Sequence, residues 1–239
     1  RRPGEDDPAR TGPRSSSETD AAGAHPRSSS EAGAAGRDEM RRARVILSSA
    51  DRAELLETAD ESLGTLSKLI TDLLDVSRVE AGVLAVSLGS VDASGAVVSA
   101  LDELGLGPDD IELGLDSALP PLHADAVLLQ RVLVNVLANA HRHAPDGTRV
   151  RVATSRLGAI AEIRVIDRGV GVPPERQRTM FAPFQREGDS DNTAGLGLGL
   201  ALSRGFMTGM GGTLTPEDTP GGGLTMVIAL PVASGSDPS

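Results

Sequence analysis

The clearest helical pattern of apolar positions lies in residues 127–143, which read VLLQRVLVNVLANAHRH. At 100° per residue, six apolar side chains fall on one wide arc, as in a helix that packs on a sheet. They are Leu129, Val132, Leu133, Val136, Leu137 and Ala140. Asp125 is placed to cap the start of this helix, and residues 145–147, Pro-Asp-Gly, end it. The pattern predicts a central helix that is buried along one side.

A polar stripe runs beside the apolar arc of this helix. It consists of Arg131, Asn135, Asn139 and Arg142. Asn is a poor helix former, and a buried amide without hydrogen-bond partners costs roughly 1–3 kcal/mol. Either the two amides are satisfied by neighbouring backbone groups, or they face a polar ligand such as a cation with phosphates. The helix alone does not decide between these interpretations.

Short strands and helices are predicted from residue 83 onward. Strands are predicted at 83–91, 111–115, 148–155, 159–167, 213–215 and 224–230. Apolar and polar positions alternate at 148–155 and 159–167, and the last two strands are expected to pair as a hairpin across residues 220–223. Further helices are expected at 97–104, 175–180 and 198–210. Strands with helices between them favour an α/β fold in which helices cover one face of a sheet.

A long helix is predicted from Asp51 to about Glu80. Its apolar positions alternate spacings of three and four, which is the seam of a coiled coil or a helical bundle. They are Leu56, Ala59, Leu63, Leu66, Ile70 and Leu73. The alternative is an ordinary amphipathic helix lying on the following domain. The narrow width of the seam favours self-association through its Leu and Ile positions.

Composition limits the remaining possibilities. Residues 1–38 hold almost no large apolar residue and are expected to be disordered, and residues 233–239 are expected to fray. The net charge of −11 argues against nucleic acid as the main partner. Cysteine is absent, which excludes disulfides and thiolate metal sites. The one lysine, Lys68, follows no glycine-rich loop, so a P-loop is excluded. No apolar run approaches the roughly 18 residues of a membrane span.

Two glycine-rich segments follow the central helix. In the first, Asp167 leaves a predicted strand and is followed by Gly169 and Gly171. Asp167 either begins a tight turn or accepts a hydrogen bond from an exocyclic amine such as adenine N6. The second segment, residues 195–199, reads Gly-Leu-Gly-Leu-Gly and opens a helix. Its N–H groups and the positive end of the helix dipole suit phosphate oxygens, although the spacing is not that of a Rossmann fingerprint.

Four motifs, taken in this order, resemble the N, G1, F and G2 boxes of the histidine kinase ATP-binding domain. They are Asn135…Asn139, Asp167-x-Gly-x-Gly, Phe181-x-x-Phe184 and Gly195-x-Gly-x-Gly. That domain belongs to the superfamily shared with Hsp90, gyrase B and MutL, and the resemblance covers about residues 55–232. Residues 185–206 and 210–231 look more narrowly like the potassium-responsive Kdp sensor kinases of actinobacteria. The resemblance implies a two-layer α/β sandwich of the Bergerat type, with a mixed sheet, over residues 83–232.

The resemblance also implies ligands and site residues. Mg²⁺ would take the carbonyl oxygen of Asn135, and the phosphates of ATP would contact Asn139 and Arg142. Adenine would lie beside His143 and bind Asp167 through N6, in a pocket shaped by Gly169 and Gly171. The lid over residues 185–193 would be anchored by Phe181 and Phe184, and the phosphates would be cradled by Gly195, Gly197 and Gly199.

The phosphoacceptor histidine of the resembled family has no counterpart in this chain. Residues 51–80 match the second helix of the family's dimerisation domain, whereas the first helix carries the acceptor. The four histidines are His25, His123, His141 and His143, and none lies upstream of the seam in an acidic, helical setting. Residues 39–82 are therefore expected to be a dimerisation remnant, with 40–49 as the stump of the lost helix. The chain begins with Arg and is interpreted as truncated, and alone it is not expected to phosphorylate itself.

Three functions remain open at this stage. The first is the ATP-binding catalytic part of a two-component sensor kinase, in the cytoplasm, with a response regulator and an intact kinase or second copy as partners. The second is a free-standing anti-sigma-factor-like Ser/Thr kinase, which does not need the seam helix. The third is a non-catalytic nucleotide-binding module that dimerises with a complete kinase. The seam through Leu56, Leu63, Leu66, Ile70 and Leu73 favours the first.

Overall fold

The computed structural model of the chain describes residues 48–185 and 197–233. The chain divides into two compact units, residues 1–56 and 57–239. Of the first unit, the description covers only residues 48–56, the beginning of a long helix. Four segments discussed above lie outside the described residues. They are residues 1–38, which were expected to be disordered, the stump up to Leu47, most of the lid at 185–193, and the tail from Ser234.

The long helix α2 spans Ser49–Glu80. It begins with a capping box, because the backbone N–H of Ser48 donates to Asp51 Oδ2 at 2.9 Å and the N–H of Asp51 donates to Ser48 Oγ at 3.1 Å. The predicted cap at Asp51 is therefore wrong, and Ser48 is the capping residue. The helix ends where Gly82 adopts a φ of +67°, as the sequence predicted.

Five strands form one mixed sheet, in the order β2-β4-β5-β7-β6. Strand β2 (Ile111–Gly114) runs parallel to β4 (Val150–Leu157), and the other neighbours are antiparallel. The remaining strands are β5 (Ile160–Ile166), β6 (Thr213–Asp218) and β7 (Leu224–Pro231). Each was predicted within a few residues, and the β6–β7 hairpin is confirmed with a longer β6.

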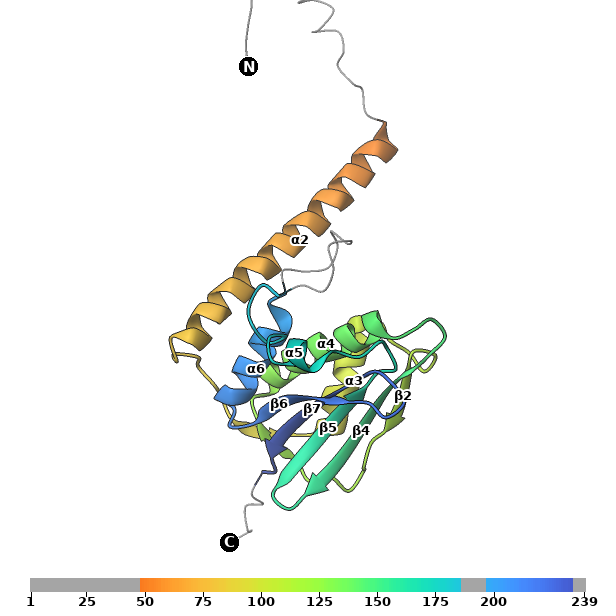
Figure 1. Ribbon diagram of the computed structural model, residues 1–239. Coiled ribbons are helices and arrows are strands. Elements are labelled where there is room, and N and C mark those ends of the chain that lie inside the picture. Colours follow the sequence, from red (N-terminus) through yellow and green to blue (C-terminus); the bar gives the residue numbers. More distant parts are fainter. Residues whose placement is uncertain (1–47, 186–196, 234–239) are drawn as a thin grey trace, which may run out of the picture. The chain divides into compact units, whose positions relative to one another are not determined.

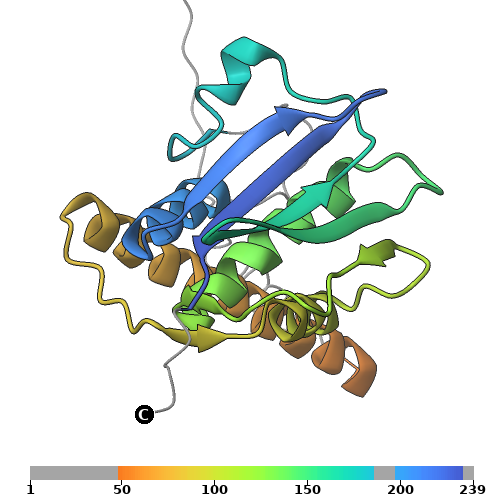
Figure 2. The ribbon, with the colours of Figure 1, turned by 90° about the horizontal axis from the view of Figure 1, so that it is seen from below.

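Helices cover one face of this sheet (Figure 1). They are α3 (Ala93–Leu104), α4 (Ala126–His143) and α6 (Gly199–Gly209). In Figure 2 the sheet lies in front of these helices, and its other face carries no helix of the described part of the chain. The predicted two-layer α/β sandwich is therefore confirmed.

Helix α4 supplies the centre of the core. All six apolar positions predicted for its buried arc are 2% exposed or less. Burial of each such aliphatic side chain contributes roughly 1.5–3 kcal/mol. The predicted cap is also confirmed, because Asp125 Oδ1 accepts hydrogen bonds from the N–H groups of Val127 and Leu128. Asp125 Oδ2 accepts a further bond from Ser87 N–H at 2.7 Å, which ties the preceding loop to the start of the helix.

The sequence misplaced three elements. The strand predicted at 83–91 is reduced to β1 (Gly89–Val91), which pairs with an unpredicted three-residue strand, β3 (Leu122–Ala124). The apolar alternation before β1 instead serves packing, because Leu84 and Val86 lie against Gly209 of α6. The helix predicted at 175–180 is a single turn, α5 (Pro174–Gln177).

Candidate nucleotide-binding site

The two asparagines of α4 lie half-buried along the side of the helix that faces α6. The side-chain amide of Asn135 donates to Gly199 O and to Ser203 Oγ, both at 3.3 Å. Neither bond uses Asn135 Oδ1, which accepts no hydrogen bond from residues 48–185 and 197–233. Asn139 lies one helical turn further on, and Arg142 is exposed near the end of α4.

The carboxylate of Asp167 is held rigidly at the end of β5. Asp167 is only 3% exposed. Asp167 Oδ1 accepts two backbone hydrogen bonds, from Gly169 N–H at 2.9 Å and from Leu224 N–H at 3.0 Å. These bonds fix the carboxylate and leave Oδ2 as an oriented acceptor. The turn interpretation and the ligand interpretation are thus compatible, because Oδ1 serves the turn and Oδ2 accepts no hydrogen bond from the described residues.

Glycines allow three backbone segments to meet around Asp167. A Cβ on Gly169 would lie 2.4 Å from His143 O, and a Cβ on Gly223 would lie 2.1 Å from Asp167 O. Gly171 has a φ of +70° and packs against the backbone of Gly223. Any larger residue at these positions would push the end of α4 or the β6–β7 turn away from Asp167. The structure therefore brings together the backbones of His143, Asp167, Gly169 and Gly171, and their role toward a ligand stays a prediction.

The start of α6 completes the described part of the site. Gly199 is the first residue of α6, and its ideal Cβ would lie 3.3 Å from Asn135 Oδ1. The unpaired N–H groups of this first turn and the positive end of the helix dipole lie beside the asparagine stripe. Gly197 has a φ of +69° and fits closely against the backbone of Gln185. Gly195 lies outside the described residues.

The two phenylalanines predicted to anchor the lid behave differently. Phe181 is buried, and the guanidinium of Arg204 lies 4.9 Å from its ring centroid. Phe184 is 57% exposed and has a φ of +64°, in a region that costs a bulky residue roughly 1–2 kcal/mol. The lid that Phe184 would anchor lies almost wholly outside the described residues, so its anchoring role stays a prediction. Phe181 alone is packed into the core.

Sequence analysis missed the contact that joins α2 to the site. Arg131, one turn before Asn135, binds Asp75 at 2.5 Å and Asp72 at 3.0 Å, both on α2. Its guanidinium also lies 4.8 Å from the ring centroid of Phe206 on α6. Nearby, Val79 packs so closely on Gly205 that a Cβ there would lie 2.5 Å from Val79 Cγ1. We call Arg131, Asp72 and Asp75 the α2 clasp.

The residues around Asn135 fit a Mg²⁺ ion that is coordinated mainly by phosphate oxygens and water. Among residues 48–185 and 197–233, no group of three His, Asp or Glu side chains is arranged to hold a metal ion. Mg²⁺ commonly takes one or two protein oxygens and completes its octahedron with water and phosphate oxygens. Asn135 Oδ1, beside the start of α6, offers one such oxygen. The site therefore suits a metal that arrives with phosphates.

Residues 124–234 match the family model described as "Histidine kinase-, DNA gyrase B-, and HSP90-like ATPase". The chain is 59% identical over 169 residues to the sensor protein KdpD of Rathayibacter rathayi, an alignment that covers 71% of this chain and 20% of the relative. It is 45% identical over 199 residues to KdpD of Mycobacterium tuberculosis, covering 80% of this chain and 23% of that protein. The chain thus spans about a fifth of the length of these curated relatives.

Solved structures agree with this similarity. Full-length ShkA in complex with AMPPNP superposes with a TM-score of 0.67 at 26% identity, over 81% of this chain and 41% of that one. The histidine kinase AdeS of Acinetobacter baumannii shares the fold, with a TM-score of 0.61 over 84% of this chain and 93% of that one. Within the described part of this chain, no helix is both long and apolar enough to cross a membrane.

Proposed function

We propose that residues 83–232 bind Mg·ATP for phosphoryl transfer to histidine, because residues 124–234 match the ATPase family of histidine kinases, DNA gyrase B and HSP90. The chain is the ATP-binding catalytic part of a sensor histidine kinase of the Kdp type. The observations that carry the proposed site are the fixed carboxylate of Asp167, whose neighbour Gly169 packs on the end of α4 at His143, and the Asn135–Gly199 contact on the same helix. One group offers an acceptor for adenine, and the other offers an oxygen for a metal.

Adenine recognition falls to Asp167. Its Oδ1 is occupied by two backbone N–H donors, so Oδ2 is the oxygen that accepts a hydrogen bond from adenine N6. Among the described residues no hydrogen bond to Oδ2 is present, so this oxygen is available to the exocyclic amine. Gly169 and Gly171 let the backbone approach the base, and His143 lies beside it.

Phosphate binding falls to α4 and α6. Asn135 Oδ1 binds Mg²⁺, which supplies charge neutralisation on the phosphates when it is bound. Asn139 and Arg142 contact phosphate oxygens, and so do the N–H groups at the start of α6, with Gly195, Gly197 and Gly199 around them. Phosphoryl transfer depends mostly on positioning and charge stabilisation, so these residues orient the γ-phosphate and do not form a covalent intermediate.

The acceptor belongs to a dimerisation helix that precedes the seam in full kinases of this type. We propose that the exposed α2 side chains Leu56, Leu63, Leu66, Ile70 and Leu73, each more than half exposed, pair with a second copy or an intact kinase. The phosphate then passes to an aspartate of a response regulator, with this domain in the cytoplasm. No His in this chain is proposed as the acceptor. The α2 seam favours this function over the Ser/Thr kinase, which does not need it.

The proposal is tested by following label from γ-labelled ATP with Mg²⁺. The chain is incubated alone, and then with a Kdp-type kinase that keeps its acceptor His but cannot bind ATP. We expect no label on the chain alone, and acid-labile, base-stable label on the added kinase. Label on the isolated chain would show that one of its four histidines is an acceptor. Absence of label in both mixtures would contradict histidine phosphorylation by this domain.

A further inference from the structure

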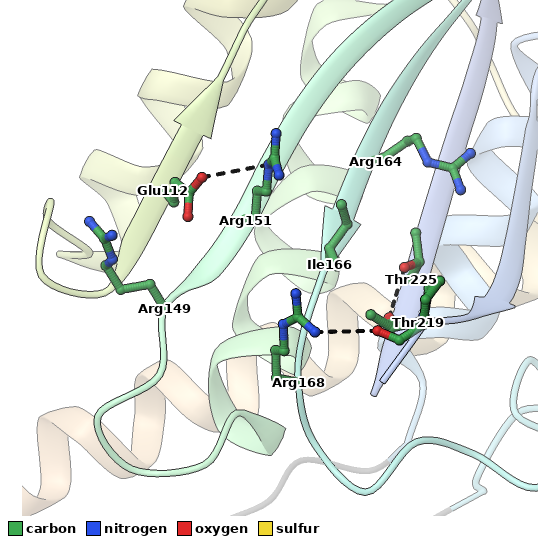
Figure 3. A pocket seen from close by; sticks show the side chains of 9 residues that line it. Glu112, Arg149, Arg151, Arg164, Ile166, Arg168, Thr219 and Thr225 are labelled. Atoms are coloured by element: carbon green, nitrogen blue, oxygen red, sulfur yellow. Dashed lines mark hydrogen bonds and ion pairs between the residues drawn. The ribbon is translucent and has the colours of Figure 1, made fainter. Parts of the chain in front are cut away.

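Four arginine side chains surround one hollow on the sheet face that the helices leave open (Figure 3). The hollow encloses about 330 Å³, and its lining includes Arg149, Arg151, Arg164, Arg168, Thr219 and Thr225. It lies over β4, β5 and β7, on the opposite side of the sheet from α4. The proposed ATP site uses none of these side chains.

Strand register explains why the arginines meet. Arg151 of β4 is paired with Ile166 of β5, and Ile166 is paired with Thr225 of β7. Alternate side chains of a strand share a face, so Arg151, Arg164, Ile166 and Thr225 all project to the open face. Arg149 precedes β4 and Arg168 follows β5, and both line the same hollow, Arg149 on its β2 side and Arg168 on its Thr219 side.

Only part of this positive charge is balanced locally. Arg164 is neutralised by ion pairs with Glu162 and Glu217, and its hydrogen bond to Glu217 is the main reason that its pKa is raised. Arg151 has a loose ion pair with the half-exposed Glu112, at 3.7 Å, which is worth little in water. Arg168 donates to the neutral carbonyl oxygen of Pro220 at 3.3 Å. Arg149 has no ion pair or side-chain hydrogen bond within the described residues.

We propose that this hollow binds a small phosphate-bearing anion through Arg149, Arg151 and Arg168. Three guanidinium groups share one weakly paired carboxylate, in a chain whose net charge is −11. Guanidinium forks match phosphate oxygens in geometry and charge. The volume lies at the lower end of the range for small-ligand pockets, roughly 300–1,000 Å³, which favours a compact anion over an extended acidic peptide.

The hollow and the ATP site are close along the chain, so a test must separate them. Asp167 and Arg168 are adjacent, but the first is buried against Leu224 N–H and the second reaches the open face. A phosphate probe is able to bind at either place. Arg142 contacts only the proposed ATP phosphates, whereas Arg149 and Arg151 line only the hollow. Variants at these positions therefore assign the probe to one site.

The experiment titrates the full chain calorimetrically with inorganic pyrophosphate and, separately, with a sugar bisphosphate, without Mg²⁺ and at fixed ionic strength. We expect saturable binding in at least one arm, and the tighter arm identifies the source of the phosphate. The double variant Arg149→Gln, Arg151→Gln should weaken binding at least tenfold. Arg156→Gln is the matched control, because Arg156 lies on the same strand but bonds Gly158 O outside the hollow. This control should leave the affinity unchanged, whereas Arg142→Gln should weaken only binding of the probe at the ATP site.

ATP titrations of the same variants distinguish failure of the proposed anion site from failure of the proposed ATP site. The double variant should bind ATP like the parent chain, which also shows that it is folded. Three results would overturn the anion site: no saturable binding in either arm, a loss of pyrophosphate binding only in Arg142→Gln, or equal losses in the double variant and Arg156→Gln. Tighter binding of a polyglutamate peptide than of either phosphate would also overturn it, in favour of a protein-binding surface.

Discussion

Replacing Arg131 with Met tests the α2 clasp, the contact that joins the seam helix to the nucleotide-binding domain. Met keeps most of the aliphatic stem but removes the guanidinium. Asp75 is 5% exposed, so the variant leaves a buried carboxylate with Arg78, whose side chain is 59% exposed, as its remaining partner. The ion pair to Asp72 and the contact with the Phe206 ring are lost as well.

The expected loss follows from the burial of the partners. Removing one member of a fully buried pair costs about 3–5 kcal/mol, but exposed pairs are worth about 0–1 kcal/mol. The side chain of Arg131 is 31% exposed and Arg78 persists, which places the ion pairs between these limits. Loss of the cation–π contact adds about 0.5–1 kcal/mol. We expect about 2 kcal/mol in total, which for a domain of this size lowers Tm by about 4–8 °C.

Urea unfolding followed by circular dichroism measures this loss, and Arg78→Met is the matched control. Arg78 pairs with the same carboxylate but is mostly exposed, so its replacement should cost less than about 1 kcal/mol. A double-mutant cycle of Arg131→Met with Asp75→Asn should give a coupling of about 1 kcal/mol or more. Equal losses for Arg131→Met and Arg78→Met, or additive effects of Arg131 and Asp75, would refute the reasoning.

Two further predictions concern the ligand and the seam. Asn135→Ala should remove the Mg²⁺ dependence of ATP affinity while leaving the fold intact, because only Oδ1 is proposed to reach the metal; calorimetry that still finds Mg²⁺ dependence in the variant would contradict this role. The chain should form a monomer–dimer mixture in sedimentation, since each buried seam side chain contributes roughly 1.5–3 kcal/mol before the entropy of association. Leu66→Ser should shift the mixture to monomer and Ser67→Ala should not, whereas a parent chain that is purely monomeric at high concentration would refute the seam.

Periodic patterns made most of the fold predictable from the sequence. The buried arc of α4 was correct at all six positions, because a helix that packs on a sheet repeats its apolar residues at a fixed angle. The strands from β4 onward followed from alternation. The segment 83–88 has the same alternation but packs on α6, and β3 is only three residues long, so neither could be assigned from local pattern. Local pattern does not report which surface a residue meets.

The site was predictable in part, because each of its motifs lies within a short stretch of the sequence. The resembled motifs pointed to Asp167, Gly169 and His143, which lie together in the structure, and the structure adds that Oδ1 of Asp167 is the oxygen committed to the turn. The clasp between Arg131 and Asp75 joins residues 56 positions apart and depends on how α2 docks. The arginine hollow depends on strand register. The exposure and positive φ of Phe184 were not predictable from its place in the resembled motif, because they depend on the local backbone conformation.

The most direct test of the proposed ATP site compares the ATP affinity of the parent chain with that of the Asp167→Asn variant, which loses the carboxylate acceptor for adenine N6. The parent chain should bind Mg·ATP with a Kd in the micromolar to millimolar range. Asp167→Asn keeps an oxygen for the N–H groups of Gly169 and Leu224, so the fold should persist, but its amide then faces adenine N6 with a donor. We predict at least a tenfold weaker Kd for ATP in a variant whose Tm is nearly unchanged. Equal affinity in the two proteins would contradict the nucleotide site.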